Sequence, residues 1–187
     1  MMRLVLVFIA ALPLGLAGCD TAQPTLDASG RPLPQVYRLK QGSLTQVQFR
    51  MLDAVNALRR ANGVGELQLN AELNAAAATH SRDMSLQNRP WHFGSDGSSP
   101  LDRVRRAGYT GIMMGENISE TYETELETLA AWMEQKDTRD VILAPGATDM
   151  GFAFFQEPNG KIWWTMVTGG PGRDPDPTIT AAEAPAL

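Results

Sequence analysis

The sequence predicts an α+β fold, a three-layer α-β-α sandwich formed by a single domain. Segments with a helical period come first, and two short segments rich in aromatic and β-branched residues follow near the C-terminal end. Both faces of these two β-type segments are apolar, whereas a strand buried on one face alternates with polar residues. Helices are therefore expected to cover both sides of the sheet.

The chain begins with a segment typical of export signals. Arg3 precedes an apolar run from Leu4 to Leu16, and the single cysteine, Cys19, follows two small residues later. The run is shorter than the ~20 residues that a membrane-spanning helix needs. The stretch LAGC resembles the lipobox of bacterial lipoproteins, which implies that residues 1–18 are a signal peptide and that Cys19 is lipidated. Two or more acyl chains anchor a protein stably.

This anchor predicts an extracytoplasmic location in a bacterial cell envelope, on the periplasmic side of the inner or the outer membrane. Cys19 has no partner for an intrachain disulfide, which fits lipidation of its thiol. Asp20 resembles an inner-membrane retention signal of some bacteria. The membrane itself is the expected partner, through the lipid anchor.

The rest of the chain divides into three parts. Residues 19–43 are rich in Pro, Thr and Gln and are predicted to be a tether. Residues 44–170 are predicted to form the domain, which is large enough to fold without disulfides. Residues 171–187 form a Pro, Ala and Asp tail that cannot build a core.

Apolar spacing and helix signals predict four helices. The first begins at Leu44 and ends at the ANG stretch, residues 61–63. Asn70 is expected to be the N-cap of the second. The third spans Pro100 to Ala107, and the fourth spans Thr124 to Gln135.

Two strands are predicted in MGFAFFQ, residues 150–156, and KIWWTMVT, residues 161–168. The pair Asn159-Gly160 between them favours a tight hairpin turn. An aromatic set on the regular elements is interpreted as core rather than as a ligand box. Its members are Trp132, Trp163, Trp164, Phe152, Phe154 and Phe155.

Composition excludes some functions. The chain has 16 basic and 21 acidic residues, a net charge of −5, and loses only Arg3 among these with the signal peptide. An acidic chain argues against a nucleic-acid partner, which requires a basic face. The sequence also lacks the H-E-x-x-H, C-x-x-C, G-x-G-x-x-G, P-loop and G-x-S-x-G motifs.

The two histidines lie close together in the sequence but in different patterns. His80 follows the apolar face of the second helix, so it is either a buried, hydrogen-bonded imidazole or a ligand. His92 lies in an irregular, glycine-rich stretch, so it is either a site residue or an exposed loop residue.

Several motifs together resemble a known family. They are LDAVNALRRANGVGELQLNAELNAAAATHSRDM, HFGSDGSS followed by RVRRAGY, GENIS, and AAWM followed by RDVILAP and DMGFAF. In order and spacing they are similar to the CAP superfamily, the cysteine-rich secretory, antigen 5 and pathogenesis-related 1 proteins that share the SCP domain. The resemblance spans about Gln46 to Gly170 and also implies an α-β-α sandwich.

The resemblance implies a cleft with two histidines and two acidic residues, which bind a divalent metal in some members. His92 matches the first histidine, and Glu116 matches the acid of the GEN motif. Two positions depart from the pattern, because Thr138 stands where many bacterial members have histidine and Gln135 where glutamate is found. Asp137 lies close enough in sequence to swing in.

These departures predict that no metal is tightly held, since zinc requires three or four ligands in a fixed geometry. No cofactor is expected, although weak binding of a divalent metal is compatible with the sequence. His80 matches the helix histidine of the family, outside the cleft. GENIS is interpreted as a cleft loop that Glu116 and Asn117 fix by hydrogen bonds, with Glu116 also a candidate partner of His92.

Three functions remain. The first is a binding module for an apolar small molecule, an envelope glycan or a protein; some eukaryotic members of the family are reported to bind sterols or other lipids. The second is a hydrolase with His92 as base, Glu116 as its orienter and a serine of the stretch 95–99 as nucleophile. The third is a scaffold with a decayed cleft. The missing ligands favour binding or scaffolding over hydrolysis.

Overall fold

A computed structural model describes residues 37–40 and 42–172 of this chain. The signal peptide, Cys19, most of the predicted tether and the tail beyond Gly172 lie outside the described residues. Among the described residues, no helix combines the length and the apolar character that crossing a bilayer requires.

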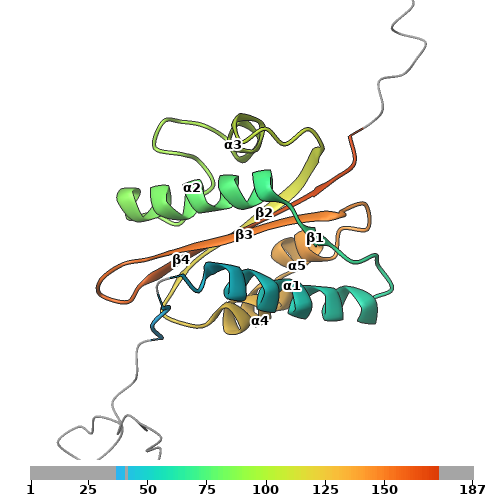
Figure 1. The fold of residues 1–187 in the computed structure, drawn as a ribbon, viewed down its shortest axis with the longest axis horizontal. Helices are drawn as coiled ribbons and strands as arrows, with labels where there is room; N and C mark the ends of the chain where they lie inside the picture. Colours follow the sequence, from blue (N-terminus) through green and yellow to red (C-terminus); the bar gives the residue numbers. More distant parts are fainter. Residues whose placement is uncertain (1–36, 41, 173–187) are drawn as a thin grey trace, which may run out of the picture. The chain divides into compact units, whose positions relative to one another are not determined.

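A four-stranded sheet lies between two layers of helices (Figure 1). In the sheet order β1-β3-β4-β2, the strands are β1 (Gln68–Leu69), β3 (Asp149–Gln156), β4 (Ile162–Gly170) and β2 (Ile112–Thr121). One face carries α2 (Ala71–Gln87) and α3 (Pro100–Arg106), and the other carries α1 (Leu44–Ala61), α4 (Glu125–Glu134) and α5 (Lys136–Ile142). The pair β1–β3 is parallel, and the other pairs are antiparallel. The predicted α+β, three-layer sandwich is confirmed.

The predicted helices form with the predicted ends. The face of α1 buries Val47, Met51 and Val55 completely, and the helix stops before Gly63, which has φ of 70°. Asn70 caps α2, because its side chain accepts a hydrogen bond from the Leu73 N–H at 2.9 Å.

The two shorter predicted helices begin at capping boxes. Ser99 and Asp102 bond reciprocally at the start of α3, and Thr124 and Glu127 do the same at the start of α4. The predicted last residue of α4, Gln135, is its C-cap and also precedes α5.

The predicted hairpin joins β3 and β4. The Glu157 N–H donates to the Lys161 carbonyl at 2.8 Å, so three residues form the loop rather than a two-residue turn. Gly160 takes φ of 99°, a left-handed conformation that glycine adopts without strain.

The stretch GENIS is not a loop, and that prediction is wrong. Glu116 and Asn117 lie in β2, paired with Val167 and Met166 of β4. The strand lacks an apolar alternation because its buried side chains at these positions are polar and bond to helices on both sides of the sheet. This polar pattern explains why the strand was missed.

The interpretation of the aromatic set as core is confirmed for most of its members. Trp163, Trp164 and Phe152 are fully buried and Trp132 is 5% exposed, while Phe154 and Phe155 are only partly buried. The rings of Phe152 and Trp164 stack with centroids 5.4 Å apart. The end of the predicted tether also packs on the domain, where the Tyr37 hydroxyl donates to Glu125 at 3.0 Å.

Candidate functional site

Glu116 lies at the centre of a buried polar cluster on the α2–α3 face of the sheet. Its side chain is 3% exposed. Nη2 of Arg103, from α3, lies 2.9 Å from Oε1 and 2.7 Å from Oε2 of Glu116. Nδ1 of His92 lies 2.9 Å from the same Oε1, and Nε2 of His80, from α2, lies 3.8 Å from it.

Arg103 is the cation of this cluster. Its side chain is 5% exposed, and its Nη1 donates to the backbone oxygens of His92 at 2.8 Å and Ser98 at 3.3 Å. Burying two charges is costly unless they are paired and hydrogen-bonded. Arg103 and Glu116 meet that condition through both Nη atoms of Arg103, so the negative charge of Glu116 is already neutralised within the protein, while Nε of Arg103 is buried without a partner among the described residues.

His92 presents its other ring nitrogen to solvent. The side chain is 50% exposed and lies in the irregular segment between α2 and α3, as the sequence predicts. A carboxylate only accepts hydrogen bonds, so Nδ1 of His92 carries a proton toward Glu116. In the neutral imidazole this leaves Nε2 as an acceptor, and no described residue bonds to it.

His80 is buried, as its helical position indicates, but only one of its two ring nitrogens has a hydrogen-bond partner among the described residues. It is 0% exposed, and its Nε2 donates to the Trp91 carbonyl at 3.0 Å. Its Nδ1 is buried without a partner among the described residues. Burial lowers the pKa of His80, although the nearby Glu116 carboxylate acts in the opposite direction.

The three serines near His92 in sequence do not bond to its imidazole. Each is engaged with a carboxylate: Ser95 with Asp83 at 2.6 Å, Ser98 with Asp96, and Ser99 with Asp102 at 2.7 Å. Among the described residues, no hydroxyl is therefore placed as a nucleophile for a base at His92.

The remaining predicted site residues lie elsewhere. Neighbouring residues of a strand point to opposite faces, so Asn117 points away from the Glu116 cluster and donates to the Thr138 carbonyl of α5 at 2.8 Å. The Thr138 hydroxyl donates to the Trp132 carbonyl at 2.5 Å. Gln135 and Asp137 are exposed at the start of α5. The structure brings together His92 and Glu116 but not the other three.

A divalent metal does not fit these residues. In the part of the chain that the structure describes, no group of three or more His, Cys, Asp or Glu side chains is arranged to hold one. A cation at Glu116 would also have to displace the guanidinium of Arg103, which already contacts both carboxylate oxygens. With Thr138 bonded to backbone, only His92 would remain as a ready ligand.

Arg103 was missed as a site residue, although a signal for it exists. It precedes Val104, which is 1% exposed, on the short helix that begins at Pro100. An arginine that is itself buried next to such a position is almost always paired, although Arg105 on the other side of Val104 is exposed. The sequence could not say that this partner is Glu116, because the pairing depends on how α3 sits against β2.

A groove of about 570 Å³ lies beside this cluster, between α2, the turn at 94–98 and α3. Arg103 and Ser98 line this groove and also belong to the Glu116 cluster. The carboxylates along the groove are already bonded, since Asp83 accepts from Ser95 and Asp96 pairs with Arg106 at 2.5 Å.

Comparisons with known proteins agree with this fold. The model of the family described as the cysteine-rich secretory protein family, CAP, matches residues 52–168. The uncharacterized protein YkwD of Bacillus subtilis (strain 168) is 29% identical over 127 residues, which are 68% of this chain and 49% of that protein. The chain therefore spans about half the length of this relative.

Solved structures share the fold at low sequence identity. An extracellular protein containing an SCP domain from Bacillus anthracis aligns with TM-score 0.61 and 20% identity, over 74% of this chain and 44% of that one. A cysteine-rich secretory protein from Staphylococcus aureus aligns with TM-score 0.60 and 13% identity, over 75% and 44%. An outer surface protein from Borrelia burgdorferi aligns with TM-score 0.60 and 10% identity, over 73% and 99%.

Proposed function

Because the chain belongs to the CAP family of cysteine-rich secretory proteins, we propose that it is an exported, lipid-anchored module that binds an envelope component without transforming it. One observation carries the proposal. Arg103 lies within 2.9 Å of both oxygens of Glu116, the acid that the family resemblance places in the cleft. A carboxylate neutralised in this way is a poor metal ligand and a poor general base.

The pairing also limits His92 as a catalyst. A carboxylate that orients a catalytic histidine works by stabilising the imidazolium that forms during the reaction. Here the charge of Glu116 is already paired with that of Arg103, and no described hydroxyl bonds to the imidazole of His92. What remains is a half-exposed histidine held in a fixed orientation, which suits contact with a ligand.

Export and anchoring rest on the sequence and on the relatives. The solved structures with this fold include a protein described as extracellular and one described as an outer surface protein. Cys19 in the stretch LAGC supplies the candidate acylation site for an anchor. Together they support a location outside the cytoplasm, with residues 20–36 between the anchor and the described domain.

Hydrolysis assays test the non-catalytic part of the proposal. The full chain and the His92→Ala variant are purified from membranes and compared on ester, peptide and glycan substrates. Equal, background-level turnover is expected for both, because Arg103 already pairs with the carboxylate that would support His92 as a base and no described hydroxyl bonds to His92. Turnover that disappears in His92→Ala would show that the His92–Glu116 pair is catalytic.

Metabolic labelling tests the anchor. Cells expressing the full chain are grown with a clickable palmitate analogue, and label on the protein is measured in the wild type and in Cys19→Ser. We expect label in the wild type only, and the membrane fraction should lose the variant. Equal labelling of both proteins, or of neither, would contradict anchoring at Cys19.

A further inference from the structure

We propose that Trp91, His92 and Phe93, here called the aromatic ledge, bind the N-acetylated sugar rings of an envelope glycan. This inference rests on the proposed function, since it names the ligand class of that binding module. It gives a role to His80, Gln87 and Arg103, which hold the ledge from below.

The backbone of the ledge is fixed by side chains. Three consecutive carbonyls each accept a hydrogen bond: Trp91 from His80 Nε2 at 3.0 Å, His92 from Arg103 Nη1 at 2.8 Å, and Phe93 from Gln87 Nε2 at 3.3 Å. Two of these donors, His80 and Arg103, are buried. A loop secured at every residue is preorganised, so little ordering is left for the binding step.

The rings of the ledge are fixed as well. Trp91 Nε1 donates to Gln87 Oε1 at 2.7 Å, and the Arg89 guanidinium lies 3.8 Å from a Trp91 ring centroid. Phe93 lies 5.7 Å from Trp91, between ring centroids, at an interplanar angle of 56°. Glu116 holds the imidazole of His92 through Nδ1. Each ring therefore has a defined orientation before a ligand arrives.

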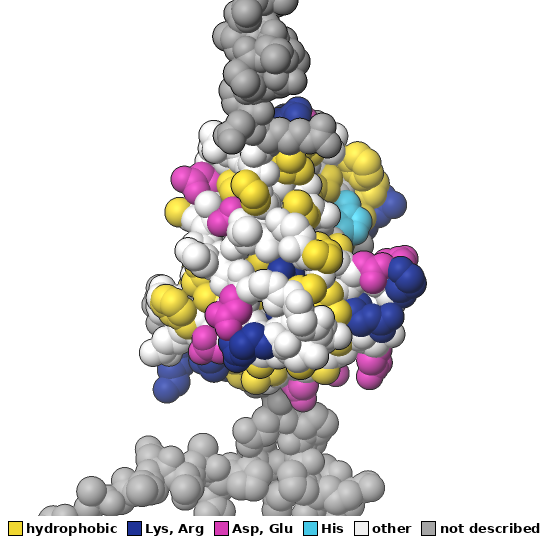
Figure 2. Space-filling view, turned by 90° about the vertical axis from the view of Figure 1, so that its right-hand side faces the viewer, with side chains coloured by type: hydrophobic (Ala, Val, Ile, Leu, Met, Phe, Trp, Pro, Cys, Tyr) yellow, Lys and Arg dark blue, Asp and Glu magenta, His cyan; other side chains and the backbone are white. Residues whose placement is uncertain are grey.

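Two of the three rings face solvent. The His92 side chain is 50% exposed and Phe93 is 48% exposed, while Trp91 is partly buried. Figure 2 shows the surface histidine with hydrophobic side chains next to it; His80 is fully buried, so this histidine is His92. The ledge thus combines an apolar ring face with a free imidazole Nε2.

A pyranose ring matches this combination. It has an apolar C–H face that stacks on aromatic rings and a rim of hydroxyl groups that form hydrogen bonds. An acetamido substituent adds two further contacts, because its N–H or C=O can form a hydrogen bond with Nε2 of His92 and its methyl group can lie on Phe93. Arg89 offers additional donors at the edge of the ledge.

Other occupants fit less well. An anionic bilayer would be repelled by a chain whose net charge is −5. A purely apolar ligand would desolvate the imidazole and the guanidinium without giving them a partner. A stable protein interface buries roughly 800 Å² on each partner, far more than two half-exposed rings supply.

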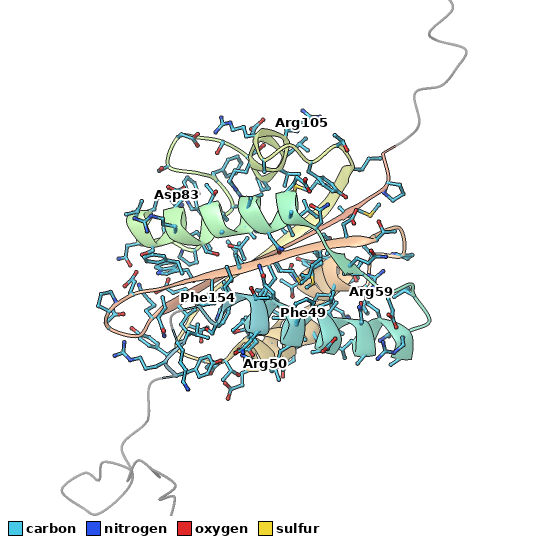
Figure 3. All side chains as sticks on the ribbon, viewed as in Figure 1. Phe49, Arg50, Arg59, Asp83, Arg105 and Phe154 are labelled. Atoms are coloured by element: carbon cyan, nitrogen blue, oxygen red, sulfur yellow. The ribbon has the colours of Figure 1, made fainter. Side chains whose placement is uncertain are left out.

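A titration with tetra-N-acetylchitotetraose tests the ledge. The full chain is held in nanodiscs of neutral phospholipid, and tryptophan fluorescence is followed, because Trp91 is the least buried tryptophan. Saturable binding is expected, and Phe93→Ala should weaken it about tenfold, as truncating an aromatic anchor does. Phe49→Ala is the matched control, since Phe49 is 53% exposed on α1 (Figure 3) and should bind as the wild type does.

The outcomes separate this inference from the proposed function. Absence of saturable binding, or equal affinity of Phe93→Ala and wild type, would overturn the aromatic ledge as a glycan site. Cleavage of the tetrasaccharide that stops in His92→Ala would overturn the non-catalytic function and leave the ligand class standing. Vesicle binding by the anchor-free Cys19→Ser chain that is lost when Phe93→Ala is added, in the absence of sugar binding, would assign the ledge to lipid.

Discussion

At the scale of single residues, the partner of Glu116 decides what the site can do. A carboxylate beside an exposed histidine is compatible with metal binding, base catalysis or a structural role. The guanidinium of Arg103, within 2.9 Å of both carboxylate oxygens, favours the structural role. A double-mutant cycle can measure this pairing, because breaking one end of a buried ion pair costs far more than replacing both ends by apolar groups.

We predict that Arg103→Met lowers the free energy of unfolding by about 3–5 kcal/mol, since it leaves Glu116 buried without its guanidinium partner. The double variant Arg103→Met/Glu116→Leu should recover much of this loss. Urea unfolding measures both. Arg106→Met is the control, because Arg106 and Asp96 are exposed and should contribute almost nothing. Strictly additive effects of the two substitutions would contradict a direct pair.

The second residue-scale prediction concerns the pH dependence of stability. Burial lowers the pKa of His80 below its usual value of 6.5, so the folded state binds fewer protons than the unfolded state. The stability it contributes is complete above the unfolded pKa and is lost as pH falls toward the lowered folded pKa.

We therefore expect the free energy of unfolding of the wild type to fall between about pH 7 and pH 5, and to fall less in His80→Gln. Urea unfolding at a series of pH values measures the slope. His92→Asn is the control and should keep most of the fall, because it leaves the buried imidazole in place. Identical slopes in the wild type and His80→Gln would rule out His80 as the source.

At the scale of elements, the sequence predicts best those that bury an apolar stripe and carry a cap. Helix α1 follows from Val47, Met51 and Val55, and α2 follows from the cap at Asn70. Strand β2 was missed, because Glu116 and Asn117 fill buried positions where apolar side chains would have shown a period. The fold family implied the sheet, but local pattern could not place its edge strand.

A buried arginine joins two elements of the α1 layer (Figure 3). Arg59, fully buried in the last turn of α1, donates only to carbonyl oxygens: Gly65, Ile142, Ala144 and Ala147. It therefore ties α1 to the end of α5 and to the loop before β3. The cost of its burial appears in its pKa, which desolvation lowers.

We predict that Arg59→Lys lowers the free energy of unfolding by about 2–4 kcal/mol, because an ammonium cannot reach all four carbonyls and unsatisfied buried acceptors are costly. Thermal and urea unfolding measure this change. Arg60→Lys is the matched control at the next position, where the side chain is exposed and pairs with Glu66, and it should change stability little. Equal effects at both positions would contradict the account.

At the scale of the whole molecule, the predicted site residues lie on opposite faces of the sheet. Resemblance to the family groups His92 with Glu116, and the structure places Nδ1 of His92 2.9 Å from Oε1 of Glu116. The resemblance could not predict the role of Arg103, because that role depends on how α3 packs against β2. It also grouped Thr138 with Glu116, whereas Thr138 bonds to Asn117 from the helices on the other face. Strand alternation separates these residues, and alternation needs the strand to be known.

The proposed binding role of the whole domain depends on this division. The side chains on the α2–α3 face bond to one another and to the backbone of the aromatic ledge, so they secure a binding surface. The side chains at the start of α5 bond to backbone or face solvent. Neither group of side chains offers the three or four unengaged ligand atoms that a zinc centre requires.

A zinc titration of the full chain tests the central claim most directly, which is that Arg103 and not a metal neutralises Glu116. Isothermal titration calorimetry at pH 7 is run on the wild type, His92→Ala and Glu116→Gln, with bound zinc measured after gel filtration. We predict that no stoichiometric zinc is retained by any of the three at micromolar metal. One zinc per chain in the wild type, lost in both variants, would contradict the claim.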